Sequence, residues 1–164
     1  MSDIQRITKT MAAAIALFTV GLAAPAFAQD AHIGTWKEDF SKSKFSPPPT
    51  GPAPISAMRT YEMFGDGLKF TATTVGADGK SGTATWSAHF DGKDYPFVGV
   101  QAYDTIALKR INASSFTSEI KKAGKVVLTV RNTVTPDGKT MTNNNKGTNA
   151  QGQPTTAMTV WEKQ

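Results

Sequence analysis

The sequence of 164 residues contains no cysteine. This absence excludes disulfide bonds, thiolate metal sites, iron–sulfur clusters and catalysis by a thiol. A folded domain must therefore be stabilised by burial of its apolar side chains alone. Histidine is also scarce: only His32 and His89 are present, far apart and without a second ligand at metal-binding spacing, so no metal site is predicted. We expect His32 to be mobile and His89 to lie on a solvated strand face.

Sequence motifs of common catalytic sites are missing as well. There is no Gly-x-Ser-x-Gly nucleophile motif and no glycine-rich phosphate loop. Six aspartates lie at or near expected turns, and that position explains them: Asp66, Asp78, Asp91, Asp94, Asp104 and Asp137. No catalytic residue and no cofactor are therefore predicted. An enzyme with two carboxylates facing each other across a cleft remains an alternative, because a sequence does not pair acids in space.

A long uncharged run occurs only at the beginning of the chain. Arg6 and Lys9 precede it, and it ends in Ala26-Phe27-Ala28, the small-x-small pattern of a signal-peptidase site. A membrane-spanning helix is the alternative, but Pro25 shortens the apolar part below the roughly 20 residues that a span requires. We therefore expect a secretory signal peptide at 1–28, a single domain at 29–164, and a periplasmic or secreted protein.

The net charge of +5 arises from basic residues that are scattered singly along the sequence. Proteins that bind nucleic acid concentrate such residues in a patch or stripe, so nucleic acid is not an expected partner. Loose contact with anionic surfaces of the cell envelope suits this charge better.

The rest of the chain consists of short runs rich in Thr, Val, Phe, Tyr and Trp, separated by turn signals such as Asp78-Gly79 and Asp91-Gly92. This pattern predicts an all-β fold, an antiparallel up-and-down meander of about 8–10 strands. Closure into a barrel would bury the faces and remove the edges, whereas a β-sandwich is the alternative. The expected strands are 33–39, 57–64, 67–75, 82–90, 94–99, 104–111, 114–121, 125–134, 139–146 and 155–163.

Two segments depart from this pattern. Residues 41–56 contain five prolines and are expected to be an extended loop, either a stiff connector between the first two strands or a flap over the mouth of the barrel. Asparagines at 143–145 disfavour strand, so the strand containing them is expected to be short or at a poorly packed edge.

The run Ile33-Gly34-Thr35-Trp36-Lys37 resembles the first strand of lipocalins, and Thr159-Val160-Trp161-Glu162-Lys163 resembles the last strand of fatty-acid-binding proteins. Both families belong to the calycin superfamily. The chain is also similar to small exported bacterial lipocalin-like proteins of unassigned role, which carry Lys-Ser-Lys-Phe and Lys-Gly-Thr-Asn-Ala-Gln-Gly-Gln as here. The resemblance implies a calycin barrel in which Gly34, Trp36 and Trp161 have structural roles in closing the barrel.

The resemblance does not extend to ligand specificity. Fatty-acid-binding proteins have two helices after the first strand, where this chain has prolines. The Arg and Tyr that bind the fatty-acid carboxylate on the last strand are replaced here by Thr159 and Trp161. The fold analogy therefore holds without implying fatty-acid binding.

Strict alternation places aromatic and basic side chains on the inward faces of the expected strands. Arg110 shares such a face with Leu108, and it either lies at the rim, for example against Trp36, or binds an anion in a cavity. We expect a binding protein that holds a small apolar or amphipathic ligand inside the barrel. The alternative is a structural or interaction protein with a filled barrel. The expected ligand-binding residues are Tyr61, Phe70, Trp86, Phe90, Leu108, Arg110 and Phe116.

Overall fold

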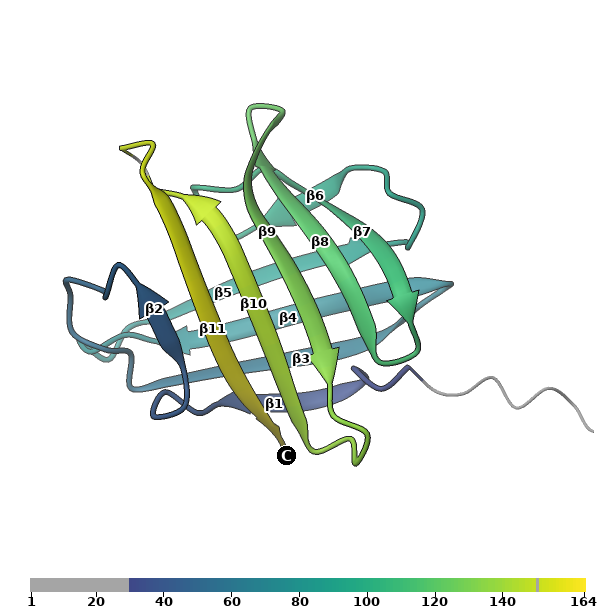
Figure 1. Ribbon diagram of the computed structural model, residues 1–164, viewed down its shortest axis with the longest axis horizontal. Helices are drawn as coiled ribbons and strands as arrows, with labels where there is room; N and C mark the ends of the chain where they lie inside the picture. The colour runs from purple at the N-terminus through teal and green to yellow at the C-terminus, as the bar shows by residue number, and fades with distance from the viewer. Residues whose placement is uncertain (1–29, 150) are drawn as a thin grey trace, which may run out of the picture.

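The computed structural model describes residues 30–149 and 151–164 (Figure 1). The predicted signal peptide, 1–28, lies outside the described residues. Within them the regular structure is entirely β-sheet. The strands are β1 (Gly34–Glu38), β2 (Lys44–Ser46), β3 (Ser56–Phe64), β4 (Gly67–Val75), β5 (Ser81–Ala88), β6 (Tyr95–Val98), β7 (Thr105–Asn112), β8 (Ser115–Lys122), β9 (Lys125–Val134), β10 (Thr140–Thr148) and β11 (Pro154–Lys163).

Strand β1 closes the sheet into a barrel. It pairs antiparallel with β3, where Trp36 lies opposite Arg59, and with β11, where Trp36 lies opposite Lys163. From β3 to β11, each strand pairs with the next one in the chain. The predicted all-β meander closed into a calycin-like barrel is confirmed, and the alternative of a sandwich is wrong because no free edge separates two sheets.

Strand β2 was not predicted, and it lies within the proline-rich segment 41–56. It pairs with the first half of β11 through Phe45 opposite Ala157, beyond the end of β1 (Figure 1). The segment is thus held to the barrel by three residues before it crosses to β3. Only pairing with β11 makes this short piece a strand, and its proline-rich sequence gave no sign of it.

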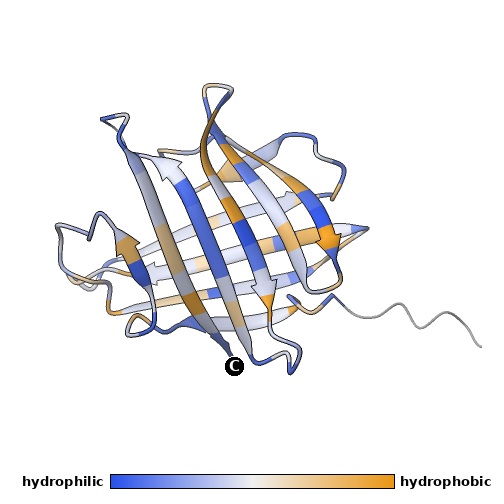
Figure 2. Ribbon diagram, viewed as in Figure 1, coloured by the Kyte–Doolittle hydropathy of each residue, from blue (hydrophilic) through white to orange (hydrophobic). Residues whose placement is uncertain are grey.

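Strand β10 corrects the expectation that the asparagines mark a short or edge strand. It is nine residues long and pairs along its length with both β9 and β11. Hydrophobic and hydrophilic residues alternate along β9, whereas the middle of β10 is hydrophilic (Figure 2). Ladder bonds on both sides hold this strand in place, and the side chain of Asn143 is carried into the barrel.

One end of the barrel is filled with side chains. Its most completely buried large residues, each less than 2% exposed, include Trp36, Leu68, Leu108, Phe116 and Met141. Gly67 permits close packing there, because a Cβ at this position would lie 2.0 Å from the carbonyl oxygen of Ala88. This filled end provides the rigid base for the hollow part of the barrel.

His32 belongs to the filled end, contrary to the expectation of a mobile residue. Its side chain is fully buried, and its ring packs edge-on against Phe116 at 4.6 Å between centroids. The backbone oxygen of His32 accepts a hydrogen bond of 2.8 Å from Trp36 Nε1. The segment before β1 is therefore part of the core and acts as a plug.

Candidate functional site

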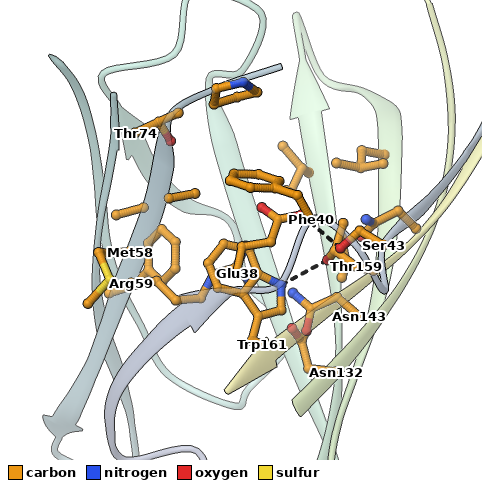
Figure 3. Close-up of a pocket in the computed structure, with 18 of the residues that line it drawn as sticks. Glu38, Phe40, Ser43, Met58, Arg59, Thr74, Asn132, Asn143, Thr159 and Trp161 are labelled. Carbon is orange, nitrogen blue, oxygen red and sulfur yellow. Dashed lines mark hydrogen bonds between the residues drawn. The ribbon is translucent and has the colours of Figure 1, made fainter. Parts of the chain in front are cut away.

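The other half of the barrel contains a cavity of about 750 Å³ that is partly open to solvent (Figure 3). Inward-facing side chains of β3 to β11, together with the proline-rich segment, line it. Pockets for small ligands typically measure about 300–1,000 Å³, so this volume is in the range of a binding site.

Aromatic rings form one wall of the cavity. The sheet register places Tyr61 opposite Phe70 and Phe70 opposite Trp86, on three successive strands. Phe70 and Trp86 stack with centroids 5.0 Å apart, and Tyr61 lies 5.2 Å from Phe70. Phe70 and Trp86 are nearly parallel, whereas the ring of Tyr61 is tilted by 53° from Phe70, and together they form an apolar wall of packed rings.

The proline-rich segment covers part of the cavity mouth. Phe45 of β2 and residues 49 and 51–54 line the cavity. Of the two alternatives, a stiff connector and a flap, these contacts with the cavity agree with the flap. Proline restricts the backbone of the flap, so the segment forms a defined wall with little conformational freedom.

The deeper part of the cavity is polar and is organised around Arg59 on β3. Its guanidinium lies over the ring of Trp161, 3.3 Å from the centroid, and Trp161 Nε1 donates a 2.9 Å hydrogen bond to Thr159 Oγ1 (Figure 3). Asn132 and Asn143, both 3% exposed, line the same region. Burial lowers the pKa of Arg59, while the neighbouring Tyr61 and the charge of Glu38 counter that effect.

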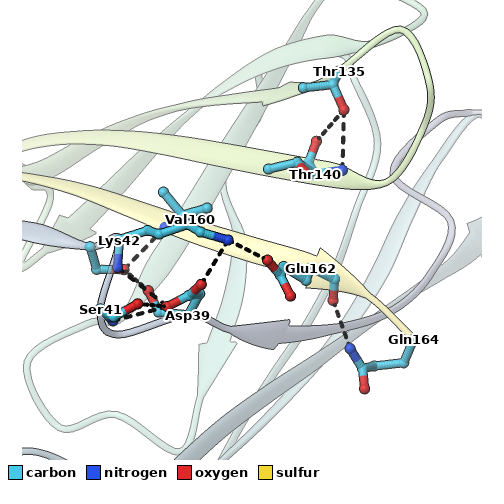
Figure 4. Close-up of polar contacts among 9 residues, drawn as sticks. Asp39, Ser41, Lys42, Thr135, Thr140, Val160, Glu162 and Gln164 are labelled. Atoms are coloured by element: carbon cyan, nitrogen blue, oxygen red, sulfur yellow. Dashed lines mark hydrogen bonds and ion pairs between the residues drawn. The ribbon is translucent and has the colours of Figure 1, made fainter.

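Glu38, at the end of β1, contributes a carboxyl group to the same cavity. Burial raises its pKa, and this effect is reduced by the hydrogen bond from Ser43 and by the charge of Arg59. Ser43 Oγ donates to Glu38 Oε1 at 3.1 Å and accepts a hydrogen bond from the backbone N–H of Val160. The turn between β1 and β2 thereby holds the carboxyl group in place, and the same turn forms an ion pair with β11 (Figure 4).

Two buried polar atoms of this region have no hydrogen-bond partner among the described residues. They are Nε of Arg59 and Oδ1 of Asn143, and both residues line the cavity. Buried polar groups in folded proteins are nearly always satisfied, so each of these two atoms leaves room for a water molecule or a bound molecule as its partner. At the filled end, His32 Nε2 is likewise without a partner among the described residues.

The seven predicted ligand-binding residues divide between the two halves of the barrel. Tyr61, Phe70 and Trp86 line the cavity, but four others do not. Alternation correctly indicates that three of those four face inward, yet they lie in the filled end, where other side chains pack against them. The residues that the structure places outside the cavity are Phe90, Leu108, Arg110 and Phe116.

Arg110 closes the filled end and binds no anion within the cavity. Its Nη2 lies 2.5 Å from Asp30 Oδ2, and its guanidinium stacks on Phe90 at 3.7 Å. Asp30 Oδ1 in turn lies 2.7 Å from His32 Nδ1. The rim position was thus the correct alternative, with the difference that Arg110 packs on Phe90 rather than on Trp36.

The basic residue on Trp36 is instead Lys163 of β11, whose Nζ lies 5.1 Å from the ring centroid. Gly34 makes room for it: the glycine has a positive φ of 125°, and a Cβ there would lie 2.9 Å from Lys163 Cε. Gly34 and Trp36 therefore occupy the closed end as the resemblance implied. Trp161 lies further inside and forms the floor of the cavity beneath Arg59.

Several polar cavity residues were missed by the sequence analysis. Glu38, Asn132, Asn143 and Thr159 line the cavity although none was proposed as a site residue. Alternation contains the signal for Asn132, which lies between the inward-facing Val130 and Val134. A polar residue within an apolar face is such a signal, because it requires a partner or a function.

Residues 30–149 and 151–164 contain no group of three or more potential metal-ligating side chains. The same part of the chain has no helix long and apolar enough to cross a membrane.

No protein-family model and no curated protein matches the sequence. Among solved structures, the chain is similar to the zebrafish ileal bile acid-binding protein complexed with cholic acid. The TM-score is 0.51 and the sequence identity is 14%, over 82% of this chain and 99% of the other. The likeness concerns the fold, and it agrees with the calycin-like barrel that the strand pairing shows.

Proposed function

We propose that this protein is an exported binding protein that holds a small apolar or amphipathic molecule inside its barrel. The observation that carries the proposal is the cavity of about 750 Å³, with one rigid aromatic wall and a polar floor. A fold neighbour crystallised with cholic acid agrees with the use of such an interior for a small hydrophobic molecule. The alternative of a filled barrel that acts only through its surface is not favoured by a hollow interior of this size.

The cavity chemistry suits binding without covalent chemistry. Apolar surface would be buried against Phe70, Trp86 and the flap, which supplies the driving force. Export rests on the sequence pattern at 1–28. Mass spectrometry of the protein recovered from a bacterial periplasm tests it, since cleavage after Ala28 would leave Gln29 as the first residue.

Binding can be tested with N-phenyl-1-naphthylamine, a neutral probe that fluoresces in apolar surroundings. Ala72 of β4 lines the cavity, so Ala72→Phe would occupy space that the probe needs. The adjacent Thr71 does not line the cavity and alternates to the outer face, so Thr71→Phe is the matched control. We expect saturable binding to the wild type and to the control, and a loss of about tenfold or more in affinity in Ala72→Phe.

Absence of probe binding to the folded wild-type protein would contradict the proposal. Equal affinities of Ala72→Phe and Thr71→Phe would also contradict it, because binding would then occur outside the barrel. Native mass spectrometry of the purified protein, before and after extraction with organic solvent, gives the mass of any molecule that co-purifies.

A further inference from the structure

The cavity contains one positive and one negative side chain, and their charges act on each other. Arg59 and Glu38 both line it. Among the described residues no ion pair joins them, whereas Arg110 at the filled end pairs with Asp30 at 2.5 Å. The guanidinium of Arg59 is held against Trp161, and the carboxyl group of Glu38 is held by Ser43. The two side chains are therefore held by different partners on the walls of one cavity.

Two separated, largely buried charges are costly unless something completes their interactions. Within the part of the chain that the structure describes, Nε of Arg59 has no hydrogen-bond partner, and neither has Oδ1 of Asn143 in the cavity lining. Carboxylate oxygens accept several hydrogen bonds, and Ser43 supplies one to Glu38. A ligand that is apolar throughout would leave these groups unsatisfied.

We propose that the ligand carries a dipolar head group of no net charge, with a negative or acceptor part at Arg59 and a positive or donor part at Glu38. This proposal rests on the proposed function and specifies its ligand class. The apolar body of the ligand would lie against the rings of Phe70 and Trp86. The amides of Asn132 and Asn143 suit such a head because each amide both donates and accepts.

A simple anion or a simple cation fits this wall less well. An anion at Arg59 would be repelled by Glu38, and a cation at Glu38 would be repelled by Arg59. Arg59 and Glu38 line the same cavity, so each charged head group would meet one side chain that repels it. The arrangement therefore favours a betaine-like or amino-acid-like head group over a head group that is a simple anion or a simple cation.

Three probes with the same dodecyl chain isolate the contribution of the head group: a carboxybetaine, a sulfate and a trimethylammonium. Each is titrated below its micellar concentration, with displacement of N-phenyl-1-naphthylamine and calorimetry as readouts. For the wild type we expect the betaine to bind about tenfold more tightly than either charged probe, the size of one charge-assisted hydrogen bond.

Neutralising Glu38 and neutralising Arg59 should change the head-group preference in opposite directions. Compared with the wild type, Glu38→Gln is expected to bind the sulfate probe about tenfold more tightly. Arg59→Gln is expected to bind the trimethylammonium probe more tightly by a similar factor. The matched controls are Glu62→Gln and Lys69→Gln. These residues form an exposed ion pair on the outer face of β3 and β4, at 3.0 Å, so each control makes the same change in net charge outside the cavity.

Equal affinities of the wild type for all three head groups would overturn the proposal, as would a wild-type preference for the sulfate or the trimethylammonium. Identical selectivity of the cavity variants and their controls would overturn it too. If Arg59→Gln does not fold, Arg59→Lys is expected to retain the wild-type order of probes. Failure of the neutral probe to bind would instead refute the proposed function itself.

Discussion

The two ends of this barrel treat buried charge differently. At the filled end, Asp30 is bracketed by His32 at 2.7 Å and by Arg110 at 2.5 Å, and aromatic rings seal the group. At the hollow end, Arg59 and Glu38 lie on the cavity walls without an ion pair between them. Both ends are built from the same strands with the same alternation of faces.

This difference separates a structural role from a binding role. Charges that serve the fold are paired within the protein, because an unpaired buried charge costs stability. Charges that serve a ligand must keep part of their hydrogen-bonding capacity open. By this criterion Arg110 belongs to the scaffold, and Arg59 is a candidate residue of the proposed binding site.

Truncating one phenylalanine at each end tests the comparison most strongly. Phe116→Ala opens a void among tightly packed side chains and should cost about 3–5 kcal/mol of unfolding free energy. Phe70→Ala enlarges a space that is already hollow, so it should cost less, about 2 kcal/mol. Urea denaturation measures both variants, and equal losses would contradict the distinction between a filled and a hollow end.

Asp30→Asn should weaken the filled end by about 2 kcal/mol at neutral pH, because it leaves Arg110 and His32 without their carboxylate. Burial acts to raise the pKa of Asp30, but hydrogen bonds from the side chain and backbone of His32 and from Arg110 outweigh it, so the pKa is below its ordinary value of 3.8. The stabilisation is therefore complete above that value and is lost as the pH falls below it.

Urea titrations at a series of acid pH values would show this dependence. The unfolding free energy of the wild type should decrease toward that of Asp30→Asn as the pH falls below 3.8. A constant gap between the two proteins across that range would show that the carboxylate charge contributes nothing to stability.

Asn143→Leu is expected to stabilise the hollow end by about 1 kcal/mol, since it replaces a buried, partly unsatisfied amide with an apolar side chain of similar volume. The same change should weaken binding of the betaine probe. Thermal unfolding measures the change in stability, and probe titration measures the change in affinity for the betaine. A destabilised variant would indicate that the amide of Asn143 is already satisfied in the empty protein.

The smallest expected effect concerns Glu38, and it is a change in how the unfolding free energy depends on pH. Its pKa is raised, mainly by burial, so its contribution to stability is greatest at low pH and declines as the pH rises through the raised pKa. This sign is opposite to that of Asp30. In Glu38→Gln the decline should disappear, and a parallel pH profile of the two proteins would contradict the burial of this carboxyl group.

The sequence predicted the barrel well because its signals are local. A period of two identifies which side of each strand faces inward, and Asp-Gly pairs mark the reversals. Alternation carries no information on depth along the barrel axis, however. Phe90, Leu108 and Phe116 therefore looked equivalent to Phe70 and Trp86, although only the latter two reach the cavity.

Other features depend on residues distant in sequence. The pairing of β2 with β11 joins Phe45 to Ala157, and nothing near Phe45 announces it. His32 is buried because Phe116 and Trp36 surround it, and the position of Lys163 over Trp36 likewise arises from the first and last strands meeting. Arg59 could be assigned to an inward face, but its lack of a partner appears only in three dimensions.

Strand β11 acts as the seam of the barrel, because it pairs with β10 on one side and with β1 and β2 on the other. A chain that ends before Pro154 has no strand to join β1 to β10, and its cavity cannot be sealed. Closure must bring together the two ends of the domain, which makes it a slow, late event in folding. Until this final segment is in place, the interior of the barrel stays open to solvent along the gap between β1 and β10.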